Sequence, residues 1–456
     1  MGKYFGTDGV RGIANTELDC ELAYKIGRAA AFVLKGQKGR RPLVYIGKDT
    51  RISGDMLEAA VAAGLTSAGA DVTLLGVIPT PGVAFLTTNT YADAGIVISA
   101  SHNSYEYNGI KIFNAKGFKL DDSLEEEIER LVDGGGAAPA KPDEIGMIRR
   151  DETLKSGYIK HVISVIEGDL SGMKVLIDCA NGAASVTARE VFSALGCEAD
   201  FVCFEPDGCN INKACGSTHM EALSAAVIEG GYDAGVAFDG DADRCLMVDE
   251  KGGLIDGDKI LGACALDMKN RGKLRGNTLV GTVMSNYGLS RFAADNGFEL
   301  ATTKVGDRYV LEEMVAKGYA LGGEQSGHVI FLKYATTGDG QVTAVKFLFL
   351  AKRLGSPVSE VAGMVPSYPQ TLINIEVCNA FKQKLDSIAE IAEEIAKAEK
   401  LLGSDGRVLV RCSGTEPLIR VMSEGGDVGK VASVAEAIAE VVRRENQRVE
   451  KEVTVK

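Results

Sequence analysis

The stretch Asp93-Ala-Gly-Ile-Val-Ile-Ser-Ala-Ser-His-Asn103 decides how the rest of the chain is interpreted. Residues 94–100 are apolar or small, and several are β-branched, which is typical of a buried strand. The polar residues Ser101, His102 and Asn103 favour a turn. Open α/β sheets bind their ligands where strands end in this way. Ser101 is therefore the candidate reacting residue, although most serines at such a place are ordinary turn residues.

The composition limits the class of protein. The chain has 456 residues, enough for about three domains, with 45% hydrophobic and 25% charged residues. A net charge of −13 argues against nucleic acid or an anionic membrane as a partner. No apolar run reaches about 18 residues, and the N-terminus lacks the apolar segment of a signal peptide. Ten cysteines in such a chain indicate reduced thiols and a cytoplasmic protein.

Short apolar strands alternate with helices along most of the chain. Strands are predicted at 43–47, 72–77, 94–100, 108–113, 174–179, 198–204, 233–238, 278–283 and 298–305. The alternation predicts three similar α/β units with parallel or mixed sheets, covered by helices on both faces. The stretch 134–142 has the composition of a linker and places the first boundary near residue 152.

The last part of the chain has a different pattern, because Pro366 and Pro369 interrupt it. Beyond them, strands are predicted at 371–377, 408–411 and 418–422, and long helices at 381–402 and 428–444. This pattern predicts a smaller α+β unit.

The strongest chemical signal is the acidic loop, Phe238-Asp-Gly-Asp-Ala-Asp-Arg244. Its three carboxylates follow a buried strand, and they repel one another unless a cation lies among them. Ligands that are all oxygens suit a hard cation, above all Mg²⁺. The Gly and Glu positions of an EF-hand are missing. The alternative is a solvated acidic turn.

Three further loops carry polar groups. The sugar loop, Gly322-Gly-Glu-Gln-Ser-Gly-His328, could hydrogen-bond hydroxyl groups. The arginine loop, Arg411-Cys-Ser-Gly-Thr-Glu-Pro-Leu-Ile-Arg420, has the cations and backbone to hold a phosphate. Near the N-terminus, Gly6-Thr-Asp-Gly-Val-Arg-Gly12 is a glycine-rich loop in which Arg11 could contact an anion. Each loop taken alone is equally well an ordinary polar turn.

The cysteines give a weaker signal. Cys197, Cys203, Cys209 and Cys215 are evenly spaced, with His219 nearby. Zinc ligands usually come as close pairs, so buried structural thiols are the favoured interpretation.

Together, the loops indicate phosphoryl transfer on a phosphorylated polyol. A nucleotide-binding P-loop and a dinucleotide fingerprint are both missing from the sequence. A serine hydrolase is disfavoured, because Ser101 and His102 are sequence neighbours and no G-x-S-x-G surrounds the serine.

With these loops in this order, the chain resembles the α-D-phosphohexomutase superfamily over nearly its whole length. The matching segments are 6–12, 99–103, 239–244, 323–328 and 411–417. Gln325 and Cys215-Gly-Ser-Thr-His219 resemble the branch that acts on glucosamine phosphates. Ser104 departs from that branch, which usually has proline there.

The resemblance implies four domains around a central cleft, at residues 1–152, 153–255, 256–367 and 368–456. In that order, they would carry the serine loop (Ser99–Asn103), the acidic loop, the sugar loop and the arginine loop. It implies an isomerase that interconverts glucosamine 6-phosphate and glucosamine 1-phosphate through a phosphoserine and a 1,6-bisphosphate, for amino-sugar nucleotide and cell-wall precursor synthesis. A hexosamine or hexose 1,6-bisphosphate would act as activator.

The resemblance also implies roles for individual residues. Ser101 would be the phosphoserine, and one Mg²⁺ would be held by Asp239, Asp241, Asp243 and an oxygen of the Ser101 phosphate. Arg11, His102 and Lys111 would lie near the reacting phosphate, with Lys111 as general base or as a structural ion pair. Substrate-binding residues would be Arg244, Asp307, Arg308, Glu324, Ser326, His328, Arg411, Ser413, Gly414, Thr415 and Arg420.

Small sugar phosphates are the expected partners, without nucleic acid or membrane, and a homodimer is left open. The alternatives are phosphoglucomutase or phosphomannomutase activity, a Mg²⁺-dependent sugar phosphatase and a sugar-phosphate binding protein without catalysis.

Overall fold

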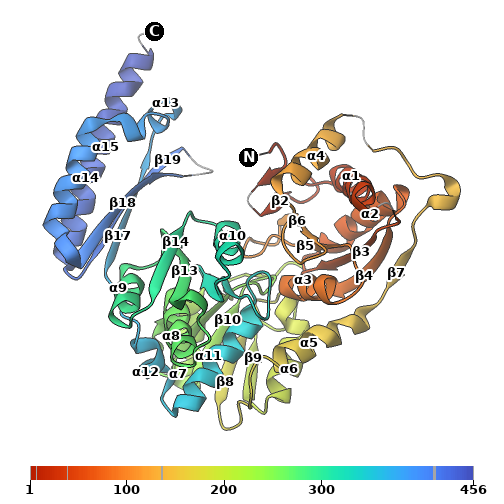
Figure 1. The fold of residues 1–456 in the computed structure, drawn as a ribbon, viewed down its shortest axis with the longest axis horizontal. Helices are drawn as coiled ribbons and strands as arrows, with labels where there is room; N and C mark the ends of the chain where they lie inside the picture. The colour runs from red at the N-terminus through yellow and green to blue at the C-terminus, as the bar shows by residue number, and fades with distance from the viewer. Residues whose placement is uncertain (1, 7, 39, 135–136, 414–416, 455–456) are drawn as a thin grey trace. The chain divides into compact units, whose positions relative to one another are not determined.

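The computed structural model describes residues 2–6, 8–38, 40–134, 137–413 and 417–454 (Figure 1). The chain forms two compact units. The first comprises Met1–Met284 and Asn296–Val365, and the second comprises Ser285–Asp295 and Pro366–Lys456. Among the helices described, none combines the length and the apolar character needed to cross a membrane.

The first sheet has seven strands in the order β1-β2-β6-β5-β3-β4-β7. Its strands are β1 (Phe5–Gly6), β2 (Gly9–Ile13), β3 (Leu43–Lys48), β4 (Asp71–Val77), β5 (Ala94–Ile98), β6 (Tyr107–Asn114) and β7 (Ile148–Arg150). The helices of this part are α1 (Cys20–Lys38), α2 (Gly54–Ser67), α3 (Thr80–Asn89) and α4 (Asp122–Asp133), with a 3₁₀ turn η1 (Pro142–Glu144).

Strand β5 is buried on both faces. Ile96 and Ile98 belong to the core that includes residues of α1 and α2, and Val97 belongs to the core with α3. A strand covered on both faces needs apolar side chains at every position, which explains the continuous apolar run of its sequence.

Helices α1 and α2 pack closely because glycines lie at their contact. A Cβ on Gly64 would lie 2.1 Å from Tyr24 O, and a Cβ on Gly27 would lie 2.4 Å from Val61 O. Any larger residue at either position would push the two helices apart.

The second and third sheets complete the first unit. The second has the order β12-β11-β10-β8-β9 and the third the order β14-β13-β15-β16. The strands of the second sheet are β8 (Lys174–Asp178), β9 (Glu198–Val202), β10 (Ala234–Phe238), β11 (Cys245–Asp249) and β12 (Leu254–Ile255). The helices of this part of the chain are α5 (Lys155–Ile163), α6 (Ala188–Ala194) and α7 (Met220–Gly230), with the 3₁₀ turns η2 (Glu152–Leu154) and η3 (Ala183–Val186). The strands of the third sheet are β13 (Thr278–Thr282), β14 (Glu299–Thr303), β15 (Leu321–Gly323) and β16 (Val329–Phe331). The helices of this part are α8 (Gly257–Asn270), α10 (Asp307–Lys317), α11 (Gly340–Leu354) and α12 (Val358–Gly363), with the 3₁₀ turn η4 (Arg275–Asn277).

The three sheets share one four-strand pattern. A first strand pairs in parallel with a second and a third, and the third pairs antiparallel with a fourth. The four strands are β3-β4-β5-β6, β8-β9-β10-β11 and β13-β14-β15-β16 in the three sheets. The loop between the third and fourth strands contains the serine loop, the acidic loop and the sugar loop, respectively. The repeated topology therefore places three candidate loops at equivalent positions.

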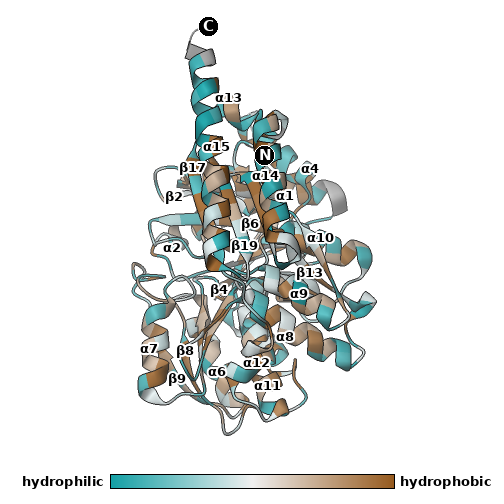
Figure 2. Cartoon of the chain, turned by 90° about the vertical axis from the view of Figure 1, so that its left-hand side faces the viewer, coloured by the Kyte–Doolittle hydropathy of each residue, from teal (hydrophilic) through white to brown (hydrophobic). Residues whose placement is uncertain are grey.

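The second unit is α+β. Its sheet, β17-β19-β18, is antiparallel, and α14 and α15 cover the same face of it (Figure 1). Helix α15 has hydrophilic and hydrophobic stretches (Figure 2), and its buried residues Val431, Val434 and Ile438 recur at helical spacing. The elements are β17 (Gln370–Glu376), β18 (Gly406–Cys412), β19 (Leu418–Gly425), α9 (Tyr287–Asp295), α13 (Asn379–Lys382), α14 (Ala389–Leu402), α15 (Val428–Thr454), η5 (Leu385–Ser387) and η6 (Gly403–Asp405).

The prediction of three α/β units and one α+β unit is confirmed. Two details of the prediction are wrong. The helix expected at 381–402 is broken into α13, η5 and α14, because Ile388 has extended backbone angles. The glycine-rich segment Gly6–Gly12 is not simply a loop, because Gly9–Ile13 forms strand β2 and pairs with β6.

We expect Gly64→Val to lower the stability of the first unit by about 2 kcal/mol or more, because the new side chain has no room against Tyr24. Thermal unfolding followed by circular dichroism measures the shift. Gly363→Ala is the matched control, since Gly363 also lies in a helix and a Cβ there would meet nothing within 4 Å. Equal melting temperatures for the two variants would contradict the close packing of α1 on α2.

Candidate active site

Ser101 follows β5 in a strained turn. Its φ of 53° lies in the left-handed region, which costs a non-glycine residue about 1–3 kcal/mol. The side chain is buried, and Ser101 Oγ donates a hydrogen bond to Asp239 Oδ2 at 2.6 Å. The backbone N–H of Ser101 donates to Ser99 Oγ at 2.9 Å. The turn therefore directs the hydroxyl of the first domain's loop at the acidic loop of the second.

Two side chains hold the carbonyl groups of the serine loop. Arg51 Nη2 donates to Ser101 O at 3.0 Å and to Asn103 O at 2.8 Å. Asn212 Nδ2 donates to the same two oxygens at 2.8 and 2.9 Å. Arg51 is itself held by Asp49, whose Oδ2 lies 2.8 Å from Arg51 Nε. Because a buried carbonyl needs such partners, these residues fix the conformation of the loop.

The acidic loop approaches the serine loop at a glycine. A Cβ on Gly240 would lie 2.5 Å from Ser101 O, so a side chain at this position would separate the two loops.

The three aspartates of the acidic loop converge. One oxygen atom from each of Asp239, Asp241 and Asp243 lies within 4.8 Å of the others, and all three residues are buried. Burial and the two neighbouring carboxylates raise the pKa of Asp239 well above its usual value. Oδ1 of Asp241 and Oδ1 of Asp243 are buried without a hydrogen-bond partner. Buried, unsatisfied carboxylate oxygens suit a hard cation, so these residues fit Mg²⁺.

Lys111 is the cation inside this group. Its Nζ lies 2.9 Å from Asp241 Oδ2, 3.1 Å from Asp8 Oδ2 and 3.6 Å from Asp243 Oδ2. Burial lowers the pKa of Lys111, but the three carboxylates outweigh it and hold the pKa well above its ordinary value. These three contacts support the ion-pair role of Lys111, and its role as a general base stays a prediction.

His102, Arg11 and Arg244 lie beside these groups. His102 Nδ1 is 3.4 Å from Ser101 Oγ. Burial, with Arg244 and Arg11 nearby, lowers the pKa of His102 to about 4, so the imidazole is neutral at neutral pH. Arg11 pairs with Asp8. The backbone N–H of Arg244 donates to Asp239 Oδ1 at 3.2 Å.

The sugar loop is anchored by its own side chains. Glu324 Oε1 accepts a hydrogen bond from Gly306 N–H at 3.0 Å, and Ser326 is exposed. Gln325 Nε2 donates to Asp256 Oδ2 at 3.1 Å, and Asp256 caps the N-terminus of α8. The amide of Gln325 is therefore engaged in holding the loop to α8.

His328 links the sugar loop to the acidic loop. Its Nδ1 lies 3.7 Å from Asp243 Oδ2, and its Nε2 lies 3.7 Å from Asp307 Oδ2. Nε2 also accepts a hydrogen bond from Gly338 N–H at 2.8 Å, which places the proton of a neutral ring on Nδ1, facing Asp243.

A cavity of about 410 Å³ lies next to these residues, lined by residues from segments 113–121 and 307–337. Lys119, Asp307, Arg308 and His328 contribute to its wall. Lys119 Nζ lies 2.7 Å from Asp307 Oδ2, and Arg308 pairs with Asp122 and Glu312. The volume is that of a small-molecule site, and its polar groups suit a hydroxylated anion.

The arginine loop lies in the second unit, between β18 and β19. Arg411 and Arg420 face each other across the two strands, and burial together with Arg420 lowers the pKa of Arg411. The Ser413 N–H donates to Leu418 O at 2.8 Å. Two guanidinium groups this close suit an anion between them. Gly414 and Thr415 lie outside the described residues.

Several residues of the site were not identified from the sequence. Arg51, Asp49 and Asn212 hold the serine loop, and Asp8 joins Lys111 to Lys119. The sequence does offer a signal for these two residues, because Asp49 directly follows the parallel strand β3 and Arg51 lies two residues further on. Asn212 follows no strand and has no comparable signal.

The cysteines form a second, smaller cluster. Asp178, Cys203 and Cys215 could each direct one atom at a common point, whereas Cys197 and Cys209 belong to no such group among the described residues. Cys215 is buried, but Cys197, Cys203 and Cys209 are partly exposed, so the expectation of buried thiols holds for only one of the four.

Sequence models of phosphoglucomutase/phosphomannomutase match four consecutive segments of the chain. The α/β/α domains I, II and III match residues 2–138, 156–253 and 256–368, and the C-terminal domain matches residues 372–441. Among curated relatives, the phosphoglucosamine mutases of Caldanaerobacter subterraneus and Clostridium novyi are both 52% identical to the chain. Each alignment covers 97% of this chain and 99% of the relative.

Solved structures agree in fold. A phosphoglucomutase/phosphomannomutase family protein from Burkholderia thailandensis is 26% identical, with a TM-score of 0.84 over 97% of this chain and 98% of that one. The N-acetylphosphoglucosamine mutase of Aspergillus fumigatus, solved with GlcNAc-6P and magnesium, is 17% identical, with a TM-score of 0.68 over 97% of this chain and 96% of that one.

We expect Asn212→Ala to loosen the serine loop, because it removes one partner from each of two buried carbonyls. A cost of about 1–3 kcal/mol would speed local amide exchange roughly tenfold or more. Hydrogen exchange of peptides covering residues 99–107 measures the effect. Asn89→Ala, at an exposed asparagine, is the control, and unchanged exchange in Asn212→Ala would contradict the anchoring role.

Proposed function

Because the chain belongs to the phosphoglucomutase/phosphomannomutase family, and within it to the phosphoglucosamine mutases, we propose that its four loops share one phosphoryl transfer between glucosamine 6-phosphate and glucosamine 1-phosphate. The enzyme is an isomerase that moves phosphate within its substrate. The observation that best supports this proposal is the 2.6 Å hydrogen bond that Ser101 Oγ donates to Asp239 Oδ2, because it joins the serine loop to the acidic loop.

Ser101 is the phosphate carrier in this proposal. The bond between Ser101 Oγ and phosphorus breaks as the free C1 hydroxyl of glucosamine 6-phosphate attacks and a new bond forms between that oxygen and phosphorus. The proton of the C1 hydroxyl ends on Ser101 Oγ, which is the leaving group. The resulting 1,6-bisphosphate turns over and returns its C6 phosphate to Ser101, which releases glucosamine 1-phosphate. A 1,6-bisphosphate of a hexose or hexosamine would serve as activator, because it can phosphorylate an unloaded Ser101.

In this scheme, the surrounding side chains stabilise the negative charge of the phosphoryl group in transfer. Lys111 stays protonated among Asp8, Asp241 and Asp243, so it favours negative charge on the group in transfer. His102 stays neutral and keeps a ring nitrogen available beside Ser101 Oγ. Arg11 and Arg244 add cations on the same side.

Asp239, Asp241 and Asp243, with an oxygen of the Ser101 phosphate, would hold one Mg²⁺. The ion would supply neutralisation of the phosphoryl charge. The unsatisfied Oδ1 atoms of Asp241 and Asp243 support this assignment.

Substrate recognition would be shared between two sets of residues. Hydroxyl groups of the sugar would be bound by Glu324, Ser326 and His328 beside Asp307 and Arg308. The phosphate that does not react would be bound by Arg411, Ser413, Gly414, Thr415 and Arg420. A bisphosphate that turns over must satisfy the same residues in two orientations, which suits hydroxyl and phosphate contacts better than contacts with one particular ring atom.

We also propose domain boundaries at 1–152, 153–255, 256–367 and 368–456, which the four matching family segments support. Sugar phosphates are the proposed partners, the proposed location is the cytoplasm and a homodimer is compatible with this assignment. The product would feed amino-sugar nucleotide and cell-wall precursor synthesis.

A change of Ser101→Ala should lower the mutase rate by several orders of magnitude, because the phosphoserine intermediate cannot form. The assay contains glucosamine 6-phosphate, Mg²⁺ and a trace of glucose 1,6-bisphosphate. Ser104→Ala, at an exposed neighbour in the same turn, should keep a near-normal rate and one added phosphate on Ser101 by mass spectrometry. Steady release of free phosphate by the unaltered enzyme would favour a phosphatase instead.

Removal of the metal gives a test that does not depend on turnover. Mg²⁺ should raise the melting temperature of chelator-treated protein, because it binds the folded carboxylates and not the unfolded chain. In Asp241→Asn the shift should fall by at least half, whereas Asp143→Asn, at an exposed carboxylate, should keep it. Equal shifts in both variants would place the Mg²⁺ elsewhere.

A further inference from the structure

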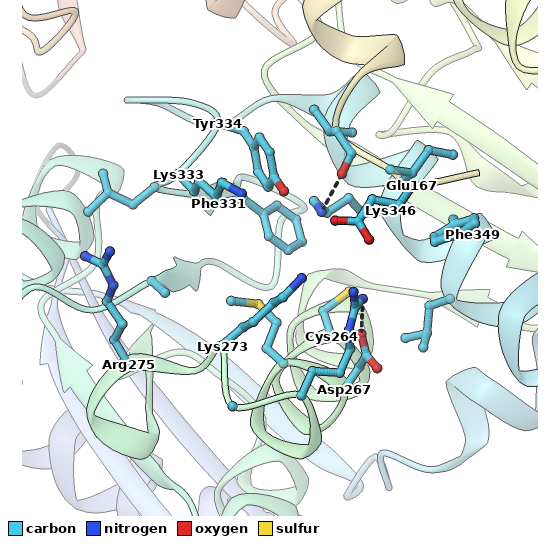
Figure 3. A pocket seen from close by; sticks show the side chains of 18 of the residues that line it. Glu167, Cys264, Asp267, Lys273, Arg275, Phe331, Lys333, Tyr334, Lys346 and Phe349 are labelled. Atoms are coloured by element: carbon cyan, nitrogen blue, oxygen red, sulfur yellow. Dashed lines mark hydrogen bonds and ion pairs between the residues drawn. The ribbon is translucent and has the colours of Figure 1, made fainter. Parts of the chain in front are cut away.

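A second cavity, of about 580 Å³, lies in the first unit and is lined by none of the residues assigned above (Figure 3). Its walls come from α8, from α11, from residues 331–334 after β16 and from residues 165–167 after α5. The volume falls within the range of small-molecule sites.

The polar part of this wall is strongly cationic. Six cations and two carboxylates line the cavity, which leaves a formal charge of +4 in a chain of net charge −13. One carboxylate, Asp267, already pairs with Arg353 and lies 3.6 Å from Arg271. Among the described residues, no carboxylate lies within 4.0 Å of the amino groups of Lys273, Lys333 and Lys346, and all three are available to an anion.

Lys346 combines a positive charge with aromatic neighbours, as the cavity does as a whole. Its Nζ lies 4.3 Å from the ring centroid of Tyr334 and 5.5 Å from that of Phe331, and it donates to Val165 O at 3.0 Å. Figure 3 shows the ring of Phe331 near the centre of the view, with Lys273 below it and Lys346 and Tyr334 above it. Burial lowers the pKa of the Lys346 ammonium, so a bound anion would stabilise its charge.

The rest of the wall is aromatic or apolar. Phe331, Tyr334, Phe349 and Tyr319 line it, together with apolar residues such as Met268 and Leu350. Aromatic faces stack on planar rings, and cations above them strengthen the contact. A nucleotide offers both a planar ring for these faces and an anion for the lysines.

We propose that this cavity binds a nucleotide, with its phosphates at Lys273, Lys333 and Lys346 and its base against Phe331 and Tyr334.

The cavity is connected to the active site by two helices. Helix α8 begins where Gly257 N–H donates to Gln325 O of the sugar loop at 2.9 Å. Helix α11 begins where Gly340 N–H donates to Ala242 O of the acidic loop at 3.0 Å. A nucleotide that contacts both helices therefore contacts two rigid elements that support active-site loops, so its binding is expected to change kcat or KM.

Isothermal titration calorimetry with ADP tests the proposal on the full chain, with Mg²⁺ present and glucose 1,6-bisphosphate saturating the active site. We expect saturable binding of ADP, and adenosine and pyrophosphate should each bind at least about tenfold more weakly. The double variant Lys273→Ala/Lys333→Ala should weaken ADP binding by about tenfold or more. Lys317→Ala, at an exposed lysine that does not line the cavity, is the control.

Several outcomes would overturn the proposal. One is that ADP shows no saturable binding, and another is that glucose 1,6-bisphosphate displaces it. A third is that the double variant and the Lys317→Ala control bind ADP with equal affinity. Pyrophosphate binding as tightly as ADP would exclude the stacked base, and adenosine binding as tightly would exclude the phosphate contacts. Binding that leaves both kcat and KM unchanged would refute the connection through α8 and α11.

Discussion

The burial of three carboxylates within a few ångströms of one another is the constraint on which the site depends. Asp239, Asp241 and Asp243 cannot all be charged in a dry interior unless cations compensate them. Lys111 supplies one such cation, and the unsatisfied oxygens of Asp241 and Asp243 leave a place for another. Ser101 is drawn into the same group by its hydrogen bond to Asp239. The need to balance this charge explains why residues of the first and second domains meet here.

In the proposed function, the same charge balance would allow Ser101 to take part in catalysis without an activating base. No general base is needed to make Ser101 a nucleophile if its usual state is phosphorylated and the protein's task is to stabilise charge on the phosphate. A protonated Lys111 and a neutral His102 suit that task. Positioning is equally important, and Arg51 and Asn212 achieve it by holding the backbone of the serine loop rather than its side chain.

Much of this arrangement could be predicted from the sequence. Strands β5 and β10 are continuous apolar runs that end in polar residues. Both strands, and the loops after them that contain Ser101 and Asp239, could therefore be identified from the sequence. Strands β2, β15 and β16 were missed, because they are short or rich in glycine and owe their conformation to a neighbouring strand. Strand β11 was also missed, although its five residues contain no glycine. Asn212 was missed because its role depends on a contact with residues over a hundred positions away. The charge state of Lys111 also needed the structure, since Asp8 and Asp243 reach it from separate segments.

The repeated four-strand pattern has a consequence for how such an enzyme can change. In the proposed function, one connection, between the third and fourth strands, has three different chemical roles on three copies of the same scaffold. With these proposed roles, a substitution in one copy would alter covalent transfer, cation binding or sugar choice while the sheets of the other two copies stay as they are. Chemistry and selectivity are thereby separable traits, and selection can act on one without rebuilding the other.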